Sequence, residues 1–212
     1  MTESLIYREV EQGSDAWLEI RRGKVTASRV ADVMAKTKTG VSASRGNYLI
    51  QLALERVTGV IEQTFTSPAM QDGIDRELQA RTLYEITTKN FVSQVAFKNH
   101  NSIEWFGASP DGLVDGQKGL IEIKCRNNAN HWEVIKSGEI PKNYWIQQQA
   151  QLSCMEYEFN DYVGFNPNFP EKSQLFIKRI YRDETFISLM ETEIKQFLEE
   201  VAEETERIKN GN

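Results

Sequence analysis

Apolar residues recur with a helical period in the first part of the chain. Ser14 precedes Trp17, Leu18 and Ile20, and Gly23 follows, a pattern typical of a short helix capped by serine and ended by glycine. This stretch therefore predicts the first helix of the protein.

Two more helices are predicted downstream, separated by a polar stretch. The first covers residues 27–36, and the second runs from Tyr48 to Val57 and is closed by Gly59. Residues 36–46 are polar, basic and rich in small residues, which predicts a mobile loop between the two helices.

A fourth helix is predicted to begin at Ser67-Pro68, with serine as the cap and proline in the first turn. Its predicted apolar stripe consists of Met70, Ile74 and Leu78. At 100° per residue, Glu77 points to the same side as this stripe. A carboxylate on the side predicted to be buried needs a functional reason.

Strand patterns follow this helix. Three consecutive strands in an antiparallel meander are predicted over residues 91–97, 103–114 and 120–125. The remaining predicted elements are helices over 129–136 and 142–155, strands over 157–165 and 175–181, and a long amphipathic helix after residue 183. This order predicts a mixed α/β fold of the α+β type in one domain.

Composition narrows the chemistry that the chain can carry. With 212 residues, 40% of them apolar, the protein is long enough to bury a substantial core. Two cysteines and two histidines are too few for a disulfide framework or a four-thiolate metal site, and they nearly exclude histidine-based metal centres. A phosphate loop of the form G-x-x-x-x-G-K-[ST] is absent from the sequence. Carboxylate chemistry is the best candidate that remains.

The start of the chain and the apolar runs predict the location of the protein. Glu3, Arg8 and Glu9 lie where a signal peptide would need an apolar stretch. No apolar run approaches the roughly 20 residues of a membrane helix. We therefore expect a cytoplasmic protein without a membrane partner.

The charge is distributed unevenly. Residues 183–212 hold nine acidic and three basic residues, so they account for the whole net charge of −6. Residues 21–45 hold seven basic residues against one acid, Asp32. This local basic patch is compatible with a nucleic-acid partner, and it makes Lys36 and Arg45 candidates for contacts with a DNA backbone.

The strand predicted over residues 120–125 places an acid and a base on one face, because alternate residues of a strand share a face. These residues are Glu122 and Lys124. A single tight hairpin can bring Asp111, in the Ser109-Pro110-Asp111-Gly112 segment, beside Glu122. An aspartate followed by Glu-x-Lys across a hairpin is an arrangement found in metal-dependent nucleases.

The residue types suit hydrolysis of a phosphodiester. Asp111 and Glu122 supply hard oxygen ligands for Mg²⁺, and we expect Mn²⁺ to substitute for it. Lys124 is placed to hold the attacking water or to help deprotonate it. Glu77 would supply a third oxygen ligand, directly or through water. Each piece alone is more often a surface pair or a turn, whereas their joint occurrence favours the functional interpretation.

Together with these residues, an ordered set of motifs resembles the lambda-type phage exonucleases, a viral recombinase family of the PD-(D/E)xK nuclease superfamily. The matching segments are Glu11 to Trp17, Arg21, Gly23, Thr26-Ala27-Ser28, Gly73 to Glu77, Ala80 to Leu83, Ser109 to Gly112 and Glu122 to Cys125. The resemblance implies a restriction-endonuclease-like core, with a central mixed sheet flanked by helices. It also implies one nuclease domain over residues 1–212, with a DNA-end-binding part over about 11–60, a catalytic core over about 66–182 and a carboxy-terminal helix over about 183–209.

The resemblance further implies an activity and partners. It implies a magnesium-dependent exonuclease that degrades the 5′-ended strand of linear double-stranded DNA and leaves a 3′ tail for recombination by strand annealing. It implies a homotrimeric ring, a single-strand annealing protein as partner, and a phage- or prophage-encoded protein in a bacterial host. A closed ring would keep the enzyme on its substrate without a motor.

Roles for individual residues come from the same resemblance. The catalytic set that it implies is Asp111, Glu122, Lys124, Glu77 and Gln147. The register of Gln147 is open, because Gln148, Gln149 and Gln151 follow closely. Arg21, Ser28 and Ser109 match positions that hold the terminal 5′ phosphate, and an arginine fork with hydroxyl groups suits that anion.

Two alternatives stay open at this point. The chain could be another nuclease of the superfamily, such as an endonuclease or a resolvase, or a noncatalytic DNA-end-binding protein. For Arg21 and its neighbour Arg22, the structural alternative is a basic helix end, and for Ser28 it is a helix cap. The acidic last helix gives a further hypothesis, that it keeps DNA off the outer surface.

Overall fold

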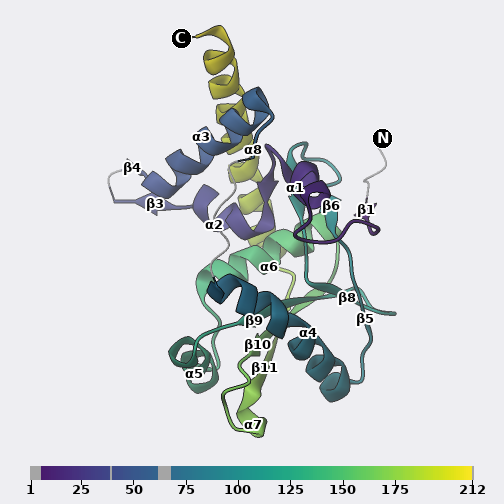
Figure 1. The fold of residues 1–212 in the computed structure, drawn as a ribbon. Helices are drawn as coiled ribbons and strands as arrows, with labels where there is room; N and C mark the ends of the chain where they lie inside the picture. Colours follow the sequence, from purple (N-terminus) through teal and green to yellow (C-terminus); the bar gives the residue numbers. More distant parts are fainter. Residues whose placement is uncertain (1–5, 39, 62–67, 212) are drawn as a thin grey trace.

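A central sheet of five strands forms the lower half of the molecule in Figure 1, a computed structural model that describes residues 6–38, 40–61 and 68–211. In spatial order its strands are β11 (Leu175–Tyr181), β10 (Phe159–Phe165), β9 (Gly119–Cys125), β8 (Gly112–Val114) and β5 (Val92–Ser93). β9 and β10 are parallel, and the other neighbours are antiparallel. The predicted mixed sheet flanked by helices is therefore confirmed.

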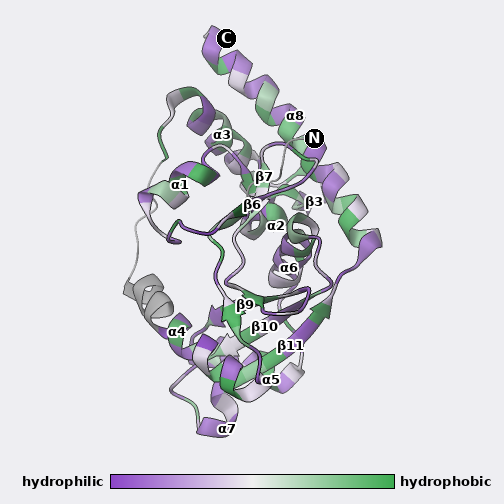
Figure 2. Cartoon of the chain, turned by 90° about the vertical axis from the view of Figure 1, so that its right-hand side faces the viewer, coloured by the Kyte–Doolittle hydropathy of each residue, from purple (hydrophilic) through white to green (hydrophobic). Residues whose placement is uncertain are grey.

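Helices cover both faces of this sheet. On one face, α4 (Pro68–Thr88) packs Ala80 and Tyr84 against Ile121 and Ile123 of β9. The other face of β9, which carries Glu122, lies against α6 (Lys142–Met155). α5 (Asn128–Ser137) and α6 connect the parallel strands β9 and β10, since parallel neighbours require a crossover. Figure 2 shows the apolar character of β9 within this sandwich.

A second, smaller sheet contains parts of the strands that the sequence pattern predicts as continuous. Its order is β1 (Ile6–Tyr7), β6 (Phe97–Asn99), β7 (Phe106–Ala108) and β2 (Val25–Thr26). The predicted strands 91–97 and 103–114 each contribute to both sheets, so the simple three-stranded meander is wrong. The second strand breaks at Ser109-Pro110-Asp111, where proline has no N–H to donate to a ladder.

The amino-terminal helices and the last helix form the upper half. Here lie α1 (Asp15–Arg21), the 3₁₀ turn η1 (Ala27–Arg29), α2 (Val30–Val33), α3 (Ala43–Thr58) and α8 (Glu184–Asn210). Figure 1 shows α3 alongside α8, and the two pack against each other. Ser14 caps α1 by accepting from the Trp17 backbone N–H, as predicted, and Gly59 ends α3 with a φ of 69°.

Two predictions for the upper half need correction. The helix predicted over residues 27–36 ends at Val33, and the predicted mobile loop over 36–46 forms a hairpin of β3 (Lys36–Thr37) and β4 (Gly40–Val41). The first turn of α3 follows directly, capped by Ser42. The last short helix, α7 (Glu171–Gln174), lies between β10 and β11.

One residue of the predicted buried face of α4 is exposed. Leu78 is 66% exposed, whereas Ala80 and Tyr84 are fully buried. The predicted cap Ser67 and the side chains of Met70 and Ile74 lie outside the described residues. Glu77 is partly buried, with a side chain 34% exposed, because it lies three residues before Ala80 and seven before Tyr84 on the same side of the helix.

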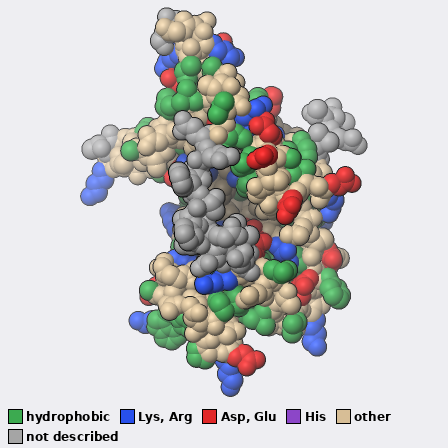
Figure 3. Space-filling model, in the orientation of Figure 1, with side chains coloured by type: hydrophobic (Ala, Val, Ile, Leu, Met, Phe, Trp, Pro, Cys, Tyr) green, Lys and Arg blue, Asp and Glu red, His purple; other side chains and the backbone are tan. Residues whose placement is uncertain are grey.

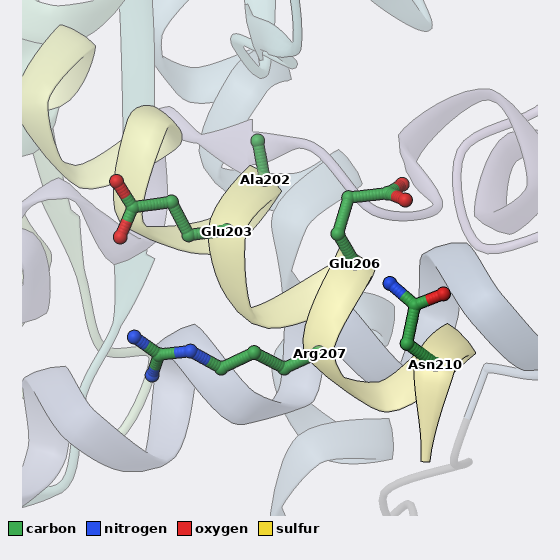
Figure 4. A pocket seen from close by; sticks show the side chains of 5 residues that line it. All are labelled: Ala202, Glu203, Glu206, Arg207 and Asn210. Carbon is green, nitrogen blue, oxygen red and sulfur yellow. The ribbon is translucent and has the colours of Figure 1, made fainter. Parts of the chain in front are cut away.

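The acidic residues of α8 gather on its exposed side, while Met190, Ile194 and Phe197 are buried below. Figure 4 shows Glu203 and Glu206 pointing outward from the last turns of the helix. Elsewhere, acidic and basic side chains are interspersed over the face in Figure 3. Across the residues that the structure describes, no helix is long and apolar enough to cross a membrane.

The exposed carboxylates of α8 are expected to repel DNA. Replacing Glu199, Glu203 and Glu206 with glutamine should strengthen nonspecific binding of duplex DNA, since fewer like charges face the phosphates. Glu200 is left in place because it pairs with Arg45. Fluorescence anisotropy across a salt series measures the effect, and equal affinity of variant and wild type at low salt would rule the hypothesis out.

Candidate active site

The hairpin of β8 and β9 brings Asp111 beside Glu122. Gly112 pairs with Ile121, and the same register continued by one residue sets Asp111 opposite Glu122. The backbone N–H of Ile123 donates to Asp111 Oδ2 at 2.6 Å, which fixes the aspartate at the start of the hairpin. The predicted approach of the two carboxylates is confirmed.

Glu122 is 1% exposed and accepts three side-chain hydrogen bonds. Lys124 Nζ lies 2.5 Å and Gln147 Nε2 2.6 Å from Glu122 Oε1. Gln151 Nε2 lies 2.5 Å from Oε2. Among the neighbouring glutamines, Gln147 therefore faces the site, as the resemblance implies, and Gln151 joins it from one helical turn further along α6.

Sequence reasoning missed the contact of Gln151 with Glu122, although an i, i+4 spacing from Gln147 is a signal for it. It also missed Arg81, which follows Glu77 at the same spacing. Arg81 Nη2 lies 2.6 Å from Glu77 Oε1 and donates to the Asp111 carbonyl at 3.2 Å. Arg81 therefore ties the α4 carboxylate to the loop that carries Asp111.

The carboxylates in this site disfavour one another's charge. Burial, and after it the charge of Glu122, raises the pKa of Asp111 well above its usual range. Burial also raises the pKa of Glu77, with Arg81 opposing the shift. For Lys124, burial lowers the pKa, but the charges of Glu122 and Asp111 outweigh it and the pKa is raised. Lys124 is therefore an ammonium donor in this arrangement.

The donor set suits a hard divalent cation. Asp111 and Glu122 present carboxylate oxygens in a buried, electrostatically crowded position, and a cation would relieve that crowding. Within the described residues, no three His, Cys, Asp or Glu side chains are grouped closely enough to hold a metal ion. Glu77 is turned toward Arg81 in this structure, so its role as a third ligand stays a prediction.

A second polar cluster adjoins the carboxylates. Arg21 Nη1 donates to Ser109 Oγ at 3.1 Å, and Trp17 Nε1 donates to the same oxygen at 3.0 Å. The Arg21 guanidinium lies 3.8 Å from the centroid of the Trp17 ring. Burial lowers the pKa of Arg21 to about 10, so the side chain stays charged at neutral pH. Ser109 and Asp111 are separated only by Pro110, so the basic and acidic clusters share one loop.

Ser28 and Arg45 are two other predicted DNA-binding residues. Ser28 lies in η1 with its Oγ 3.3 Å from Oγ1 of Thr26 in β2, and its part in binding an anion stays a prediction. Arg45 does not fit its predicted place in an exposed loop. Its guanidinium is buried beneath α8, where it forms two hydrogen bonds with Glu200 at 2.7 and 2.8 Å and donates to the Val33 carbonyl. This packing against the last helix gives no support to a DNA contact by Arg45.

Comparison with known proteins finds a matching family and similar solved structures. The model of the YqaJ-like viral recombinase domain matches residues 16–158. An alkaline exonuclease, LHK-Exo from Laribacter hongkongensis, is 43% identical with a TM-score of 0.87, and the match covers 93% of this chain and 97% of that one. The same figures hold for its complex with dAMP.

A more distant structure has the same fold. A phage-related exonuclease from Haemophilus somnus 129PT is 16% identical with a TM-score of 0.65, and the match covers 89% of this chain and 96% of that one. No curated protein matches the chain. The family match spans more than half of the chain and includes the loop with Ser109 and Asp111, the Glu122-x-Lys124 strand and Gln147. The chain therefore belongs to the YqaJ-like viral recombinase family.

Proposed function

We propose that this protein is a Mg²⁺-dependent exonuclease that degrades the 5′-ended strand of linear double-stranded DNA. The observation that carries the proposal is the short loop shared by the two clusters. Ser109 contacts Arg21, a guanidinium and hydroxyl pair suited to a terminal phosphate, and Asp111, two residues on, lies opposite Glu122. The 43% identity to an alkaline exonuclease, which has also been solved with dAMP, supports the same assignment.

The roles of the residues follow from their chemistry. Arg21 and the Ser109 hydroxyl would hold the terminal 5′ phosphate through charge-assisted hydrogen bonds. Asp111 and Glu122 would hold the Mg²⁺, with Glu77 as a further ligand or a partner for its water. When bound, the ion would polarise the scissile phosphate and stabilise negative charge on the leaving oxygen.

Lys124 would orient the attacking water. Its raised pKa favours the protonated form, so it is better suited to donating a hydrogen bond than to accepting a proton. Gln147 would keep the Glu122 carboxylate in place from α6. Because Ser109, which contacts Arg21, and Asp111 lie on one loop, an end held by Arg21 would present a nearby phosphodiester to the ion.

We further propose the assembly and partners that accompany this activity. A homotrimeric ring would enclose the DNA and retain it between cuts. The 3′ tail would be passed to a single-strand annealing protein for recombination, in a bacterial host that carries the phage or prophage. Mn²⁺ should replace Mg²⁺, since both accept carboxylate and water ligands in octahedral geometry.

Digestion of duplex DNA labelled separately on each strand tests the proposed activity. The substrates are linear DNA with 5′ phosphate, linear DNA with 5′ hydroxyl, and closed circles, each with Mg²⁺ or with EDTA. We expect Mg²⁺-dependent loss of the 5′-ended strand from linear DNA, faster with 5′ phosphate, and intact circles.

The other outcomes distinguish the alternatives. Cutting of the circle would assign the protein to the endonuclease branch. Binding of linear ends without cleavage at any Mg²⁺ or Mn²⁺ concentration would point to a noncatalytic end-binding protein. Loss of the 3′-ended strand would overturn the polarity.

A further inference from the structure

Behind Glu122, a chain of side-chain amides runs away from the site into the core. Gln151 Nε2 donates to Glu122 Oε2 at 2.5 Å, and Gln151 Oε1 accepts from Asn160 Nδ2 at 2.6 Å. Asn160 Oδ1 in turn accepts from Gln148 Nε2 at 3.0 Å. All three amides are fully buried, so these hydrogen bonds are shielded from water.

The direction of this chain follows from the carboxylate at its end. An ionised carboxylate only accepts hydrogen bonds, so Gln151 must turn its NH₂ group toward Glu122 and its oxygen toward Asn160. Asn160 must then donate with its own NH₂ group and accept from Gln148. Asn160 is held in β10, where it pairs with Leu120 of β9, so a rigid strand supports the chain.

The amides hold Glu122 without neutralising it. A buried carboxylate needs hydrogen-bond donors, and Lys124 already supplies one positive charge at Glu122 Oε1. Gln147 donates to the same oxygen and Gln151 donates to Oε2 as neutral groups, so the amides add no further positive charge that would compete with a bound cation. Gln151 Nε2 also lies 3.4 Å from the Ser109 carbonyl, at the loop that carries Asp111.

We propose that Gln151, held in direction by Asn160, is a positioning residue that orients the Glu122 carboxylate to receive a divalent cation. This inference rests on the proposed metal-dependent function. Partners of metal-binding carboxylates set ligand orientation, and their loss typically weakens metal binding by about 10- to 100-fold.

Mn²⁺ binding to the DNA-free protein, followed by electron paramagnetic resonance of free Mn²⁺, tests the role directly. Gln151→Met keeps the length of the side chain and removes its donor. We expect it to weaken Mn²⁺ binding by about 10- to 100-fold. It should also raise the Mg²⁺ concentration for half-maximal cleavage more than it lowers the rate at saturating Mg²⁺.

Gln149→Met is the matched control. Gln149 is a fully buried neighbour on α6, but its amide bonds the Tyr181 carbonyl and the Asp183 N–H instead. We expect it to lower the midpoint of thermal unfolding and to leave Mn²⁺ affinity unchanged. A purely structural role for Gln151 would make the two variants behave alike, which would overturn the proposal.

A second variant covers the case in which Gln151→Met does not fold. Asn160→Leu does not touch Glu122, but it frees the Gln151 amide to reverse and should also weaken Mn²⁺ binding. Affinity equal to that of the wild type in a folded Asn160→Leu protein would overturn the directional role of Asn160.

Asp111→Asn separates the failure of this inference from the failure of the proposed function. If wild type and Asp111→Asn bind Mn²⁺ equally, the metal site itself is misassigned. If Asp111→Asn loses Mn²⁺ while Gln151→Met binds as tightly as the wild type, only the positioning role is wrong.

Discussion

Replacing Lys124 with methionine is expected to abolish DNA cleavage while the protein stays folded. The ammonium lies 2.5 Å from Glu122 Oε1 and is the one cation paired with that carboxylate among the described residues. Removing one preorganised hydrogen-bond donor from an active site costs roughly 10²- to 10³-fold in rate. Single-turnover digestion of 5′-phosphorylated linear duplex at saturating Mg²⁺ measures the loss.

Lys178→Met is the matched control for this experiment. Lys178 also pairs with a glutamate, Glu139, at 2.6 Å, but it lies on β11 and its partner is exposed. The control should cleave like the wild type. Mn²⁺ binding should persist in Lys124→Met, because Asp111 and Glu122 remain. Undiminished cleavage by Lys124→Met would show that the Glu122–Lys124 ion pair is structural and that Lys124 has no part in catalysis.

Replacing Arg179 with methionine is expected to destabilise the fold strongly. Asp161, 1% exposed in β10, accepts two hydrogen bonds from Arg179 at 2.8 and 2.9 Å and one from Tyr84 at 2.7 Å. Without Arg179, a buried carboxylate loses its counter-charge. We expect a loss of about 3 kcal/mol in the free energy of unfolding, the lower end for broken buried pairs, because Arg179 is partly exposed.

Urea unfolding measures this free energy, with Lys178→Met again as the control on the same strand. The exposed Lys178–Glu139 pair should contribute no more than about 1 kcal/mol. The Tyr84 contact also anchors the helix that carries Glu77, so a milder loss of cleavage should accompany the instability. Equal losses of unfolding free energy in Arg179→Met and Lys178→Met would show that the Arg179–Asp161 pair stabilises the fold no more than an exposed ion pair does.

Part of the candidate site was predictable because it depends on local geometry. The two-residue period of a strand sets Glu122 and Lys124 on one face, and a tight hairpin returns the chain so that Asp111 lies opposite Glu122. Both relations span few residues. The bounds of α6 and β11 also agree with the predicted ones, and Pro141 marks the start of α6.

Side chains that meet across distant elements were harder to assign. Arg45 has the charge of a DNA contact, yet it is buried against Glu200, 155 residues away in sequence. Leu78 belongs to an apolar stripe but points to solvent, because the sheet covers the neighbouring face of α4. A periodic pattern shows which residues share a face, and does not show which face another element covers.

By itself, the sequence determined that Asp111, Glu122 and Lys124 lie together, the helical and strand periods, and the concentration of negative charge in the last helix. Only the tertiary structure decided that Gln147 and Gln151 both hold Glu122, that Arg81 joins Glu77 to the Asp111 loop, and that Arg21 meets Ser109. The physical reason is the range of the interactions. Periodicity and turns act over a few residues, whereas burial and hydrogen bonding between elements depend on how the whole chain packs.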